Sequence, residues 1–185
     1  HQSDNVGCAI LTGTGEAAFI AGGDLKDFSQ LNTPQQGAEM GKRMQEILSR
    51  WEMLPMPTIA AIGANAYGGG CEVALACDMR IMADTASLVF SQVRLGLMTG
   101  WGGAYRLVRL VGPGNAMAIL TTGEYVDAQR GKALGLLTGV APEGFALAHA
   151  LDLARQITRH DDGAVQSIKT AILAASSQPA EQAME

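Results

Sequence analysis

Short apolar runs alternate with glycine-rich turns in the first half of the chain, and longer stretches with helical periodicity follow. Residues 6–11 and 58–62 are apolar runs of strand length that lead into glycine, so both predict buried strands. Between them, Thr33, Pro34 and Gln36 supply an N-cap, a proline at the first helical position and the glutamine of a capping box. A helix is therefore predicted to begin at residue 34, and the next two prolines of the chain end it.

Helices dominate the predicted structure after the glycine run at residues 68–70. Further short strands are expected at residues 80–83 and 88–90, where brief apolar runs recur. The predicted helices are residues 71–77, 102–111, 115–122, 128–134, 145–158 and 164–175. No internal repeat, low-complexity segment or linker interrupts this order, so the sequence predicts a single α/β domain with a helical C-terminal part.

The composition suits a compact α/β protein, with 48% hydrophobic residues, 17% charged residues and 23 glycines among 185 residues. The formal net charge is −5 and no run of Lys or Arg stands out, which argues against nucleic acid as a partner. No uninterrupted apolar stretch of about 18 residues occurs, so no membrane association is expected. Cys8, Cys71 and Cys77 lie in apolar stretches, which indicates buried thiols in a reducing compartment and hence a cytoplasmic location.

The sequence argues against a dinucleotide-binding site and against a metal site. Residues 13–18 match the G-x-G-x-x-A dinucleotide fingerprint after an apolar strand. That fingerprint needs a helix to begin at once and an acidic residue about 20 positions later, and the sequence supplies neither. His1, His149 and His160 lack metal-ligand spacing, so no metal site is expected.

The candidate chemistry lies in two glycine turns, each placed just after a predicted strand or its turn. The first is Ala21-Gly22-Gly23-Asp24, and the second runs from Gly68 to Glu72. Glycine by itself only permits tight turns. Exposed backbone N–H groups carry partial positive charge, however, so two such turns brought together would stabilise a developing oxyanion.

The sequence around these turns resembles the crotonase (enoyl-CoA hydratase/isomerase) superfamily over nearly the whole chain. The first turn, within residues 19–26, is similar to the family motif in which an Ala-Gly pair precedes an oxyanion-hole residue and Asp-Leu-Lys follows. The second family motif is matched almost residue for residue by residues 57–62, 68–72 and 76–80. Residues 94–97 and 100–103, ahead of Arg106-Leu107, are similar to the third.

The resemblance implies a fold, a ligand and roles for individual residues. The fold would be a crotonase-like spiral of ββα repeats with a helical C-terminal part, usually assembled as a homotrimer or a hexamer. The ligand would be an acyl-CoA thioester, and no separate cofactor is expected because coenzyme A is part of the substrate. Gly23 and Gly69 would supply the oxyanion-hole N–H groups, and Glu72 would be a catalytic carboxylate. Ala21, Asp24 and Leu25 would lie along the CoA path, and the acyl pocket would be shaped by Phe28, Leu97, Met98 and Trp101.

One catalytic position departs from the family pattern. The second glutamate of the hydratases is expected four positions before Gly96, where this chain has Gln92. Glutamine cannot transfer a proton near neutral pH, but it can orient a water or a substrate carbonyl. We therefore hypothesise that Glu72 is the single acid/base and that Gln92 holds a polar partner. For Glu72, a helix N-terminus would stabilise the anion while an apolar pocket would destabilise it.

Three functions remain open on this pattern. An enzyme of the enoyl-CoA hydratase/isomerase type, which stabilises a thioester enolate, agrees best with the motifs. A malonyl-type acyl-CoA decarboxylase needs only one proton donor, and its superfamily members often lack the second glutamate, as this chain does. A catalytically silent acyl-CoA-binding protein would keep the fold without turnover.

Three further expectations concern structure. Asp78 and Arg80 are expected to form an ion pair that holds the strand after the short helix. Thr99 stands where the family commonly has proline, which leaves the shape of the acyl pocket open. Residues 1–185 are expected to form one core domain that lacks the N-terminal hairpin and helix and the last C-terminal helices of the family, so that apolar turns are exposed and favour association.

Overall fold

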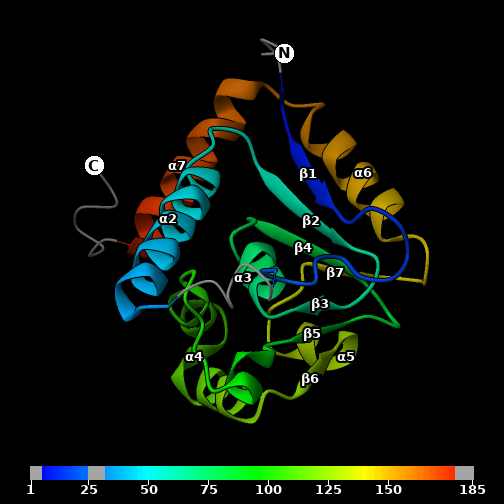
Figure 1. Cartoon of the computed structure of the whole chain (residues 1–185). Coiled ribbons are helices and arrows are strands. Elements are labelled where there is room, and N and C mark those ends of the chain that lie inside the picture. The colour runs from blue at the N-terminus through cyan, green and yellow to red at the C-terminus, as the bar shows by residue number, and fades with distance from the viewer. Residues whose placement is uncertain (1–5, 25–31, 178–185) are drawn as a thin grey trace.

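The computed structural model describes residues 6–24 and 32–177, which form an α/β structure (Figure 1). The strands are β1 (Ala9–Thr12), β2 (Thr58–Ile62), β3 (Ala66–Tyr67), β4 (Met79–Ala83), β5 (Ser87–Val89), β6 (Tyr125–Asp127) and β7 (Gly139–Ala141). The helices are α2 (Pro34–Glu52), α3 (Gly69–Leu75), the 3-10 helix η1 (Ser91–Leu95), α4 (Gly103–Thr122), α5 (Ala128–Ala133), α6 (Ala146–Ile157) and α7 (Asp162–Ser177).

Consecutive strands of the chain enter two different sheets. A parallel four-stranded sheet has the order β1-β2-β4-β7, and a three-stranded sheet has the order β3-β5-β6. The units β2-β3-α3 and β4-β5-α4 each place their first strand in the larger sheet and their second strand in the smaller one. This repeated ββα step turns the chain, and α3 packs against α4 on the face of the larger sheet opposite α6 (Figure 1).

The larger sheet is covered on both faces, which explains its continuous apolar strands. On β2, Ile59 and Ala61 face one side and pack with residues of α6, including Ala150. The alternate residues Ala60 and Ile62 point to the main core, which contains residues of α3 and α4. Because both faces exclude water, all five residues of β2 are buried.

Most predicted elements are confirmed, with differences at short elements. The capping box is present, because the Thr33 hydroxyl accepts from the Gln36 N–H at 3.2 Å and the Gln36 side chain accepts from the Thr33 N–H at 3.2 Å. Helix α3 begins at Gly69, two residues earlier than predicted, and the two predicted helices at 102–122 are one element broken at Gly112. The sequence did not reveal β3, β6 or β7, which have only two or three residues each.

The expected ion pair between Asp78 and Arg80 is wrong, although both residues hold structure. Asp78 pairs instead with Lys169 of α7 at 2.8 Å, and its Oδ2 accepts from the N–H and the hydroxyl of Thr58. The buried Arg80 donates to the main-chain carbonyls of Leu136, Ala74, Cys77 and Asp78. Main-chain carbonyls thus satisfy the Arg80 guanidinium, which the sequence pattern predicted to pair with a carboxylate.

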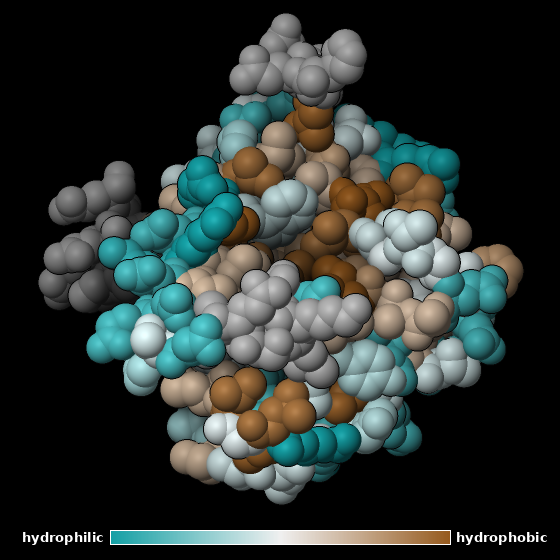
Figure 2. Space-filling model, in the orientation of Figure 1, coloured by the Kyte–Doolittle hydropathy of each residue, from teal (hydrophilic) through white to brown (hydrophobic). Residues whose placement is uncertain are grey.

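Several large apolar side chains are exposed, and the face in Figure 2 carries patches of apolar surface. On α6 these include Leu147 and Leu151, and on α7 Ile168 and Ile172. No helix in residues 6–24 and 32–177 is both long and apolar enough to cross a bilayer.

The ion pair of Asp78 with Lys169 predicts a stability difference. Substitution Asp78→Asn leaves the buried Lys169 ammonium without its counter-ion, so we expect a loss of roughly 3 kcal/mol in the free energy of unfolding. Asp152→Asn breaks an ion pair with Arg155 whose side chains are 64% and 68% exposed, and it should cost under about 0.5 kcal/mol. Urea denaturation of both variants measures this difference, and equal losses would contradict the assignment.

Candidate active site

The two glycine turns lie against each other. The segment after β1 joins the smaller sheet through a bridge between Ile20 and Ala66, and the Tyr67 N–H donates to the Ile20 carbonyl at 3.0 Å. A Cβ built on Gly22 would lie 3.2 Å from the Gly69 nitrogen. The backbone at Gly22 is therefore in direct contact with the start of α3. Gly22 also has φ +100, which a side chain would disfavour.

Main chain and ring atoms leave no space for side chains at the start of α3. A Cβ on Gly70 would lie 2.2 Å from the Ile20 carbonyl oxygen, and a Cβ on Gly69 would lie 2.2 Å from the Trp101 ring. Gly69 is the first residue of α3, so its N–H has no acceptor within the helix. Among the described residues no other backbone acceptor contacts that N–H.

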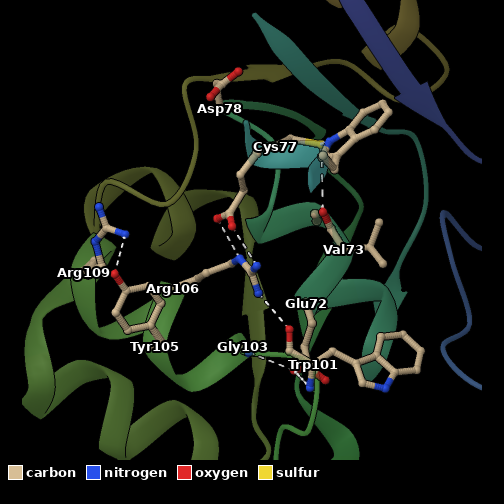
Figure 3. Close-up of polar contacts among 12 residues, drawn as sticks. Glu72, Val73, Cys77, Asp78, Trp101, Gly103, Tyr105, Arg106 and Arg109 are labelled. Carbon is tan, nitrogen blue, oxygen red and sulfur yellow. Dashed lines mark hydrogen bonds and ion pairs between the residues drawn. The ribbon is translucent and has the colours of Figure 1, made fainter. Parts of the chain in front are cut away.

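Glu72 of α3 is a buried carboxylate bound by three donors. Its side chain is 2% exposed. Oε1 accepts from the backbone N–H groups of Trp101 and Gly103, both at 2.8 Å, and Oε2 accepts from Nε2 of Gln92 at 3.0 Å. Figure 3 shows Glu72 beside the turn that carries Trp101 and Gly103. The carboxylate is thus fixed in one orientation by two backbone groups and one amide.

Burial decides the pKa of Glu72. Desolvation raises the pKa above its ordinary value, because the charged form loses its hydration. The hydrogen bonds from Gly103, Trp101 and Gln92 lower it, as does the positive charge of Arg106, but these effects are smaller. Of the two opposing effects expected from the sequence, burial is therefore the stronger. The net effect is a Glu72 pKa above its ordinary value.

Gln92 lies at the start of η1 and presents an unused acceptor. Its Nε2 is directed to Glu72, and its Oε1 is buried without a hydrogen-bond partner in the part of the chain that the structure describes. The amide orientation follows from the network, since an ionised Glu72 needs a donor. A buried acceptor beside a carboxylate is energetically unfavourable unless a ligand or solvent group donates to it.

The residues predicted to contact substrate lie in different parts of the structure. Ala21 and Asp24 flank the Gly22 turn and are exposed, and Leu25 and Phe28 lie outside the described residues. Trp101 places its ring against Gly69. Leu97 and Met98 lie in the loop between η1 and α4 and are 53% and 77% exposed. Thr99 is buried in that loop, where its hydroxyl accepts from the Ala104 N–H at 3.1 Å and so caps the first turn of α4.

Sequence reasoning missed the backbone donors to Glu72, and it missed Arg106, which holds the turn that carries them. Arg106 of α4 is 6% exposed and contacts both the Trp101 carbonyl and Glu52. The pair Gly102-Gly103 was the available signal, since adjacent glycines before a helix permit close approach of other groups. No group of three His, Cys, Asp or Glu residues that could hold a metal ion occurs within residues 6–24 and 32–177.

Comparison with solved structures identifies the class of the fold. The crystal structure of an enoyl-CoA hydratase from Bacillus anthracis matches with a TM-score of 0.93 and 37% sequence identity, over 99% of this chain and 70% of that chain. The ββα arrangement is therefore that of a crotonase-type α/β protein, as predicted.

Sequence comparisons give the family. The enoyl-CoA hydratase/isomerase family profile matches residues 1–185. A short-chain-enoyl-CoA hydratase of Clostridium acetobutylicum is 37% identical over 172 residues, covering 93% of this chain and 66% of the relative. An ethylmalonyl-CoA decarboxylase of Danio rerio is 34% identical over 171 residues, covering 90% of this chain and 57% of the relative. The chain belongs to the enoyl-CoA hydratase/isomerase family, and it spans less than two thirds of the length of these two relatives.

The contact between Gly69 and Trp101 predicts coupled effects on stability. Gly69→Ala inserts a methyl group into the indole, so we expect a loss of about 1–3 kcal/mol in unfolding free energy. In a Trp101→Ala background the same methyl group has room, and the added loss should be under about 0.5 kcal/mol. A double-mutant cycle from urea denaturation measures this coupling, and additive losses would show that the ring does not occupy the space above Gly69.

Proposed function

We propose that the protein hydrates an enoyl-CoA thioester, with Glu72 as the single acid/base and with the backbone N–H groups of Gly23 and Gly69 as the oxyanion hole. The observation that carries the proposal is the pairing of the buried Glu72 carboxylate with the unpartnered Oε1 of Gln92. A water molecule supplies the O–H donors that both acceptors can use, and hydration needs a water held in this way next to a base.

The proposed reaction conserves protons within the site. Glu72 removes a proton from the water as the water oxygen bonds to the β-carbon of the enoyl group. The carbon–carbon π electrons move to the thioester and give an enolate oxygen, which two backbone N–H groups stabilise. Glu72 then returns its proton to the α-carbon, which completes the addition. The contact between the Gly22 backbone and the Gly69 nitrogen supports a shared oxyanion site at this corner.

The hydrogen-bond inventory favours hydration over the decarboxylase alternative. A malonyl-type substrate brings a second carboxylate, which needs donors or a cation. The Glu72 carboxylate and the carbonyl oxygen of Gln92 are both acceptors. The guanidinium of Arg106 is already bound to Glu52 and to a main-chain carbonyl. A substrate carboxylate would therefore be repelled here. The third alternative, a silent acyl-CoA-binding protein, does not use the pKa shift of Glu72 toward neutral pH.

Exposed apolar surface and free thiols support proposals on assembly and location. Exposed apolar residues on α6 and α7 support self-association, for which a homotrimer or hexamer is the proposed form. The described cysteines are free thiols, which supports a reducing compartment and hence the cytoplasm. Ala21 and Asp24 on the Gly22 turn, with Leu25, are proposed to contact coenzyme A, and Phe28, Leu97, Met98 and Trp101 to contact the acyl group.

Removing the acid/base defines the first functional prediction. Glu72→Gln should lower kcat for crotonyl-CoA hydration by roughly 10²–10⁴-fold, because the amide cannot accept the proton of water. In the wild type, the rate should fall as pH decreases through the raised pKa of Glu72, so the acid limb lies above the ordinary pKa of a glutamate. Absorbance assays over a pH series measure both effects, with the exposed Glu143→Gln as control. Unchanged turnover of Glu72→Gln would contradict the assignment.

The decarboxylase alternative is tested directly on substrates. We expect crotonyl-CoA to be hydrated and ethylmalonyl-CoA to release no CO₂ above the rate of a sample without protein. Mass spectrometry of the thioester products separates the outcomes, because hydration adds one water and decarboxylation removes CO₂. Release of CO₂ without hydration would replace the proposal by the decarboxylase, and tight thioester binding without either product would favour the silent binder.

A further inference from the structure

Arg106 is a buried cation that connects three parts of the fold. Its Nε and Nη2 donate to the two carboxylate oxygens of Glu52, at the end of α2, at 2.7 and 2.8 Å. Its Nη1 donates to the Trp101 carbonyl at 2.8 Å. Figure 3 shows the guanidinium next to the turn that carries Trp101 and Gly103. A planar fork bound at three points has one orientation, so its position fixes that turn relative to α2.

The turn from Trp101 to Gly103 is held between Arg106 and Glu72. A Cβ on Gly102 would lie 2.5 Å from Nη1 of Arg106, and a Cβ on Gly103 would lie 2.6 Å from Cγ of Glu72. Neither glycine could carry a side chain without moving one of these two groups. The Trp101 backbone links Arg106 and Glu72, because its carbonyl accepts from Arg106 and its N–H donates to Glu72.

We propose that Arg106, oriented by Glu52, is a positioning residue that fixes the Trp101–Gly103 turn so that its N–H groups aim the Glu72 carboxylate, and that its positive charge stabilises the negative charge of this carboxylate. The inference rests on the proposed function of Glu72 as the acid/base. The polar partners of Arg106 among the described residues are Glu52 and the Trp101 carbonyl, so it acts on Glu72 through the backbone of the turn and through its electric field.

The charges around Glu72 give opposite effects for the two members of the ion pair. Among the described residues, Arg106 on α4 is the charged group that lowers the pKa of Glu72, and Glu52 on α2 lies behind it. Cys71 is adjacent in sequence, and burial raises the pKa of its thiol, so it stays neutral. On the side of η1 the facing group is Gln92, which does not titrate. Loss of Arg106 therefore removes a favourable charge, whereas loss of Glu52 leaves that charge uncompensated.

The test compares Arg106→Gln with Glu52→Gln, which break the same ion pair from its two ends. A purely structural ion pair predicts similar loss of stability and no directed change in the pH profile. The proposal predicts that the acid limb of kcat moves to higher pH in Arg106→Gln and to lower pH in Glu52→Gln. Arg106→Lys keeps the charge but loses the fork, so kcat should fall roughly 10- to 100-fold with the limb near its wild-type position and KM little changed. Arg155→Gln, in an exposed ion pair, is the control.

Direct titration of Glu72 makes the test independent of turnover. Carboxyl-¹³C NMR of glutamate-labelled protein, with Glu72→Gln to assign the signal, should give the same order of pKa values: highest in Arg106→Gln, then wild type, then Glu52→Gln. Shifts in one common direction, or no shift in either variant, would overturn the positioning role. The opposite shifts without any thioester hydration would support the positioning role and would show that the proposed function is wrong. If Arg106→Gln does not fold, Glu52→Gln and Arg106→Lys still decide the sign.

Discussion

The close approach of other groups to the main chain at three glycine corners is the constraint on which the site depends. The Gly22 backbone contacts the Gly69 nitrogen, Gly70 lies against the Ile20 carbonyl, and Gly103 lies against the side chain of Glu72. A Cβ would lie 2.2 Å from the Ile20 carbonyl oxygen at Gly70 and 2.6 Å from Cγ of Glu72 at Gly103, and Gly22 has φ +100, so all three positions favour glycine. Because these corners end short strands or start helices, the two sheets fix their relative positions, and the site gains rigidity from the ββα framework.

Burial of Glu72 follows from the same packing. A carboxylate at 2% exposure loses most of its hydration, which raises its pKa, and the fold offsets part of this cost with three donors and one nearby cation. A donor set of two backbone N–H groups cannot rotate or titrate, so it holds the carboxylate in the same place in both protonation states. A raised pKa suits a group that exchanges a proton near neutral pH, and in this way the packing agrees with the proposed acid/base role of Glu72.

The sequence revealed the elements whose signals are local, and missed those that depend on distant partners. The Thr33 capping box and the glycine turns are short-range patterns, and both were found. Strands β3 and β7 have two and three residues, and only their pairing with β5 and β4 makes them strands. Arg80 was assigned to the wrong partner because its acceptors are main-chain carbonyls, which leave no mark in a sequence. The donors to Glu72 are backbone groups for the same reason, and the orientation of Gln92 exists only in the assembled network.

The glutamine at position 92 is compatible with catalysis because of where it lies. A second carboxylate at 3.0 Å from Glu72 would compete with it for one proton, and the pair would titrate together rather than as separate groups. With an amide there, Glu72 is the group that titrates, and burial raises its pKa against the opposing effects of its three hydrogen bonds and of the Arg106 charge. Hydration takes one proton from water and returns one to carbon, so a single carboxylate can perform both transfers. In the proposed reaction, the Gln92 carbonyl oxygen accepts a hydrogen bond from the water while its N–H group holds the Glu72 carboxylate in line.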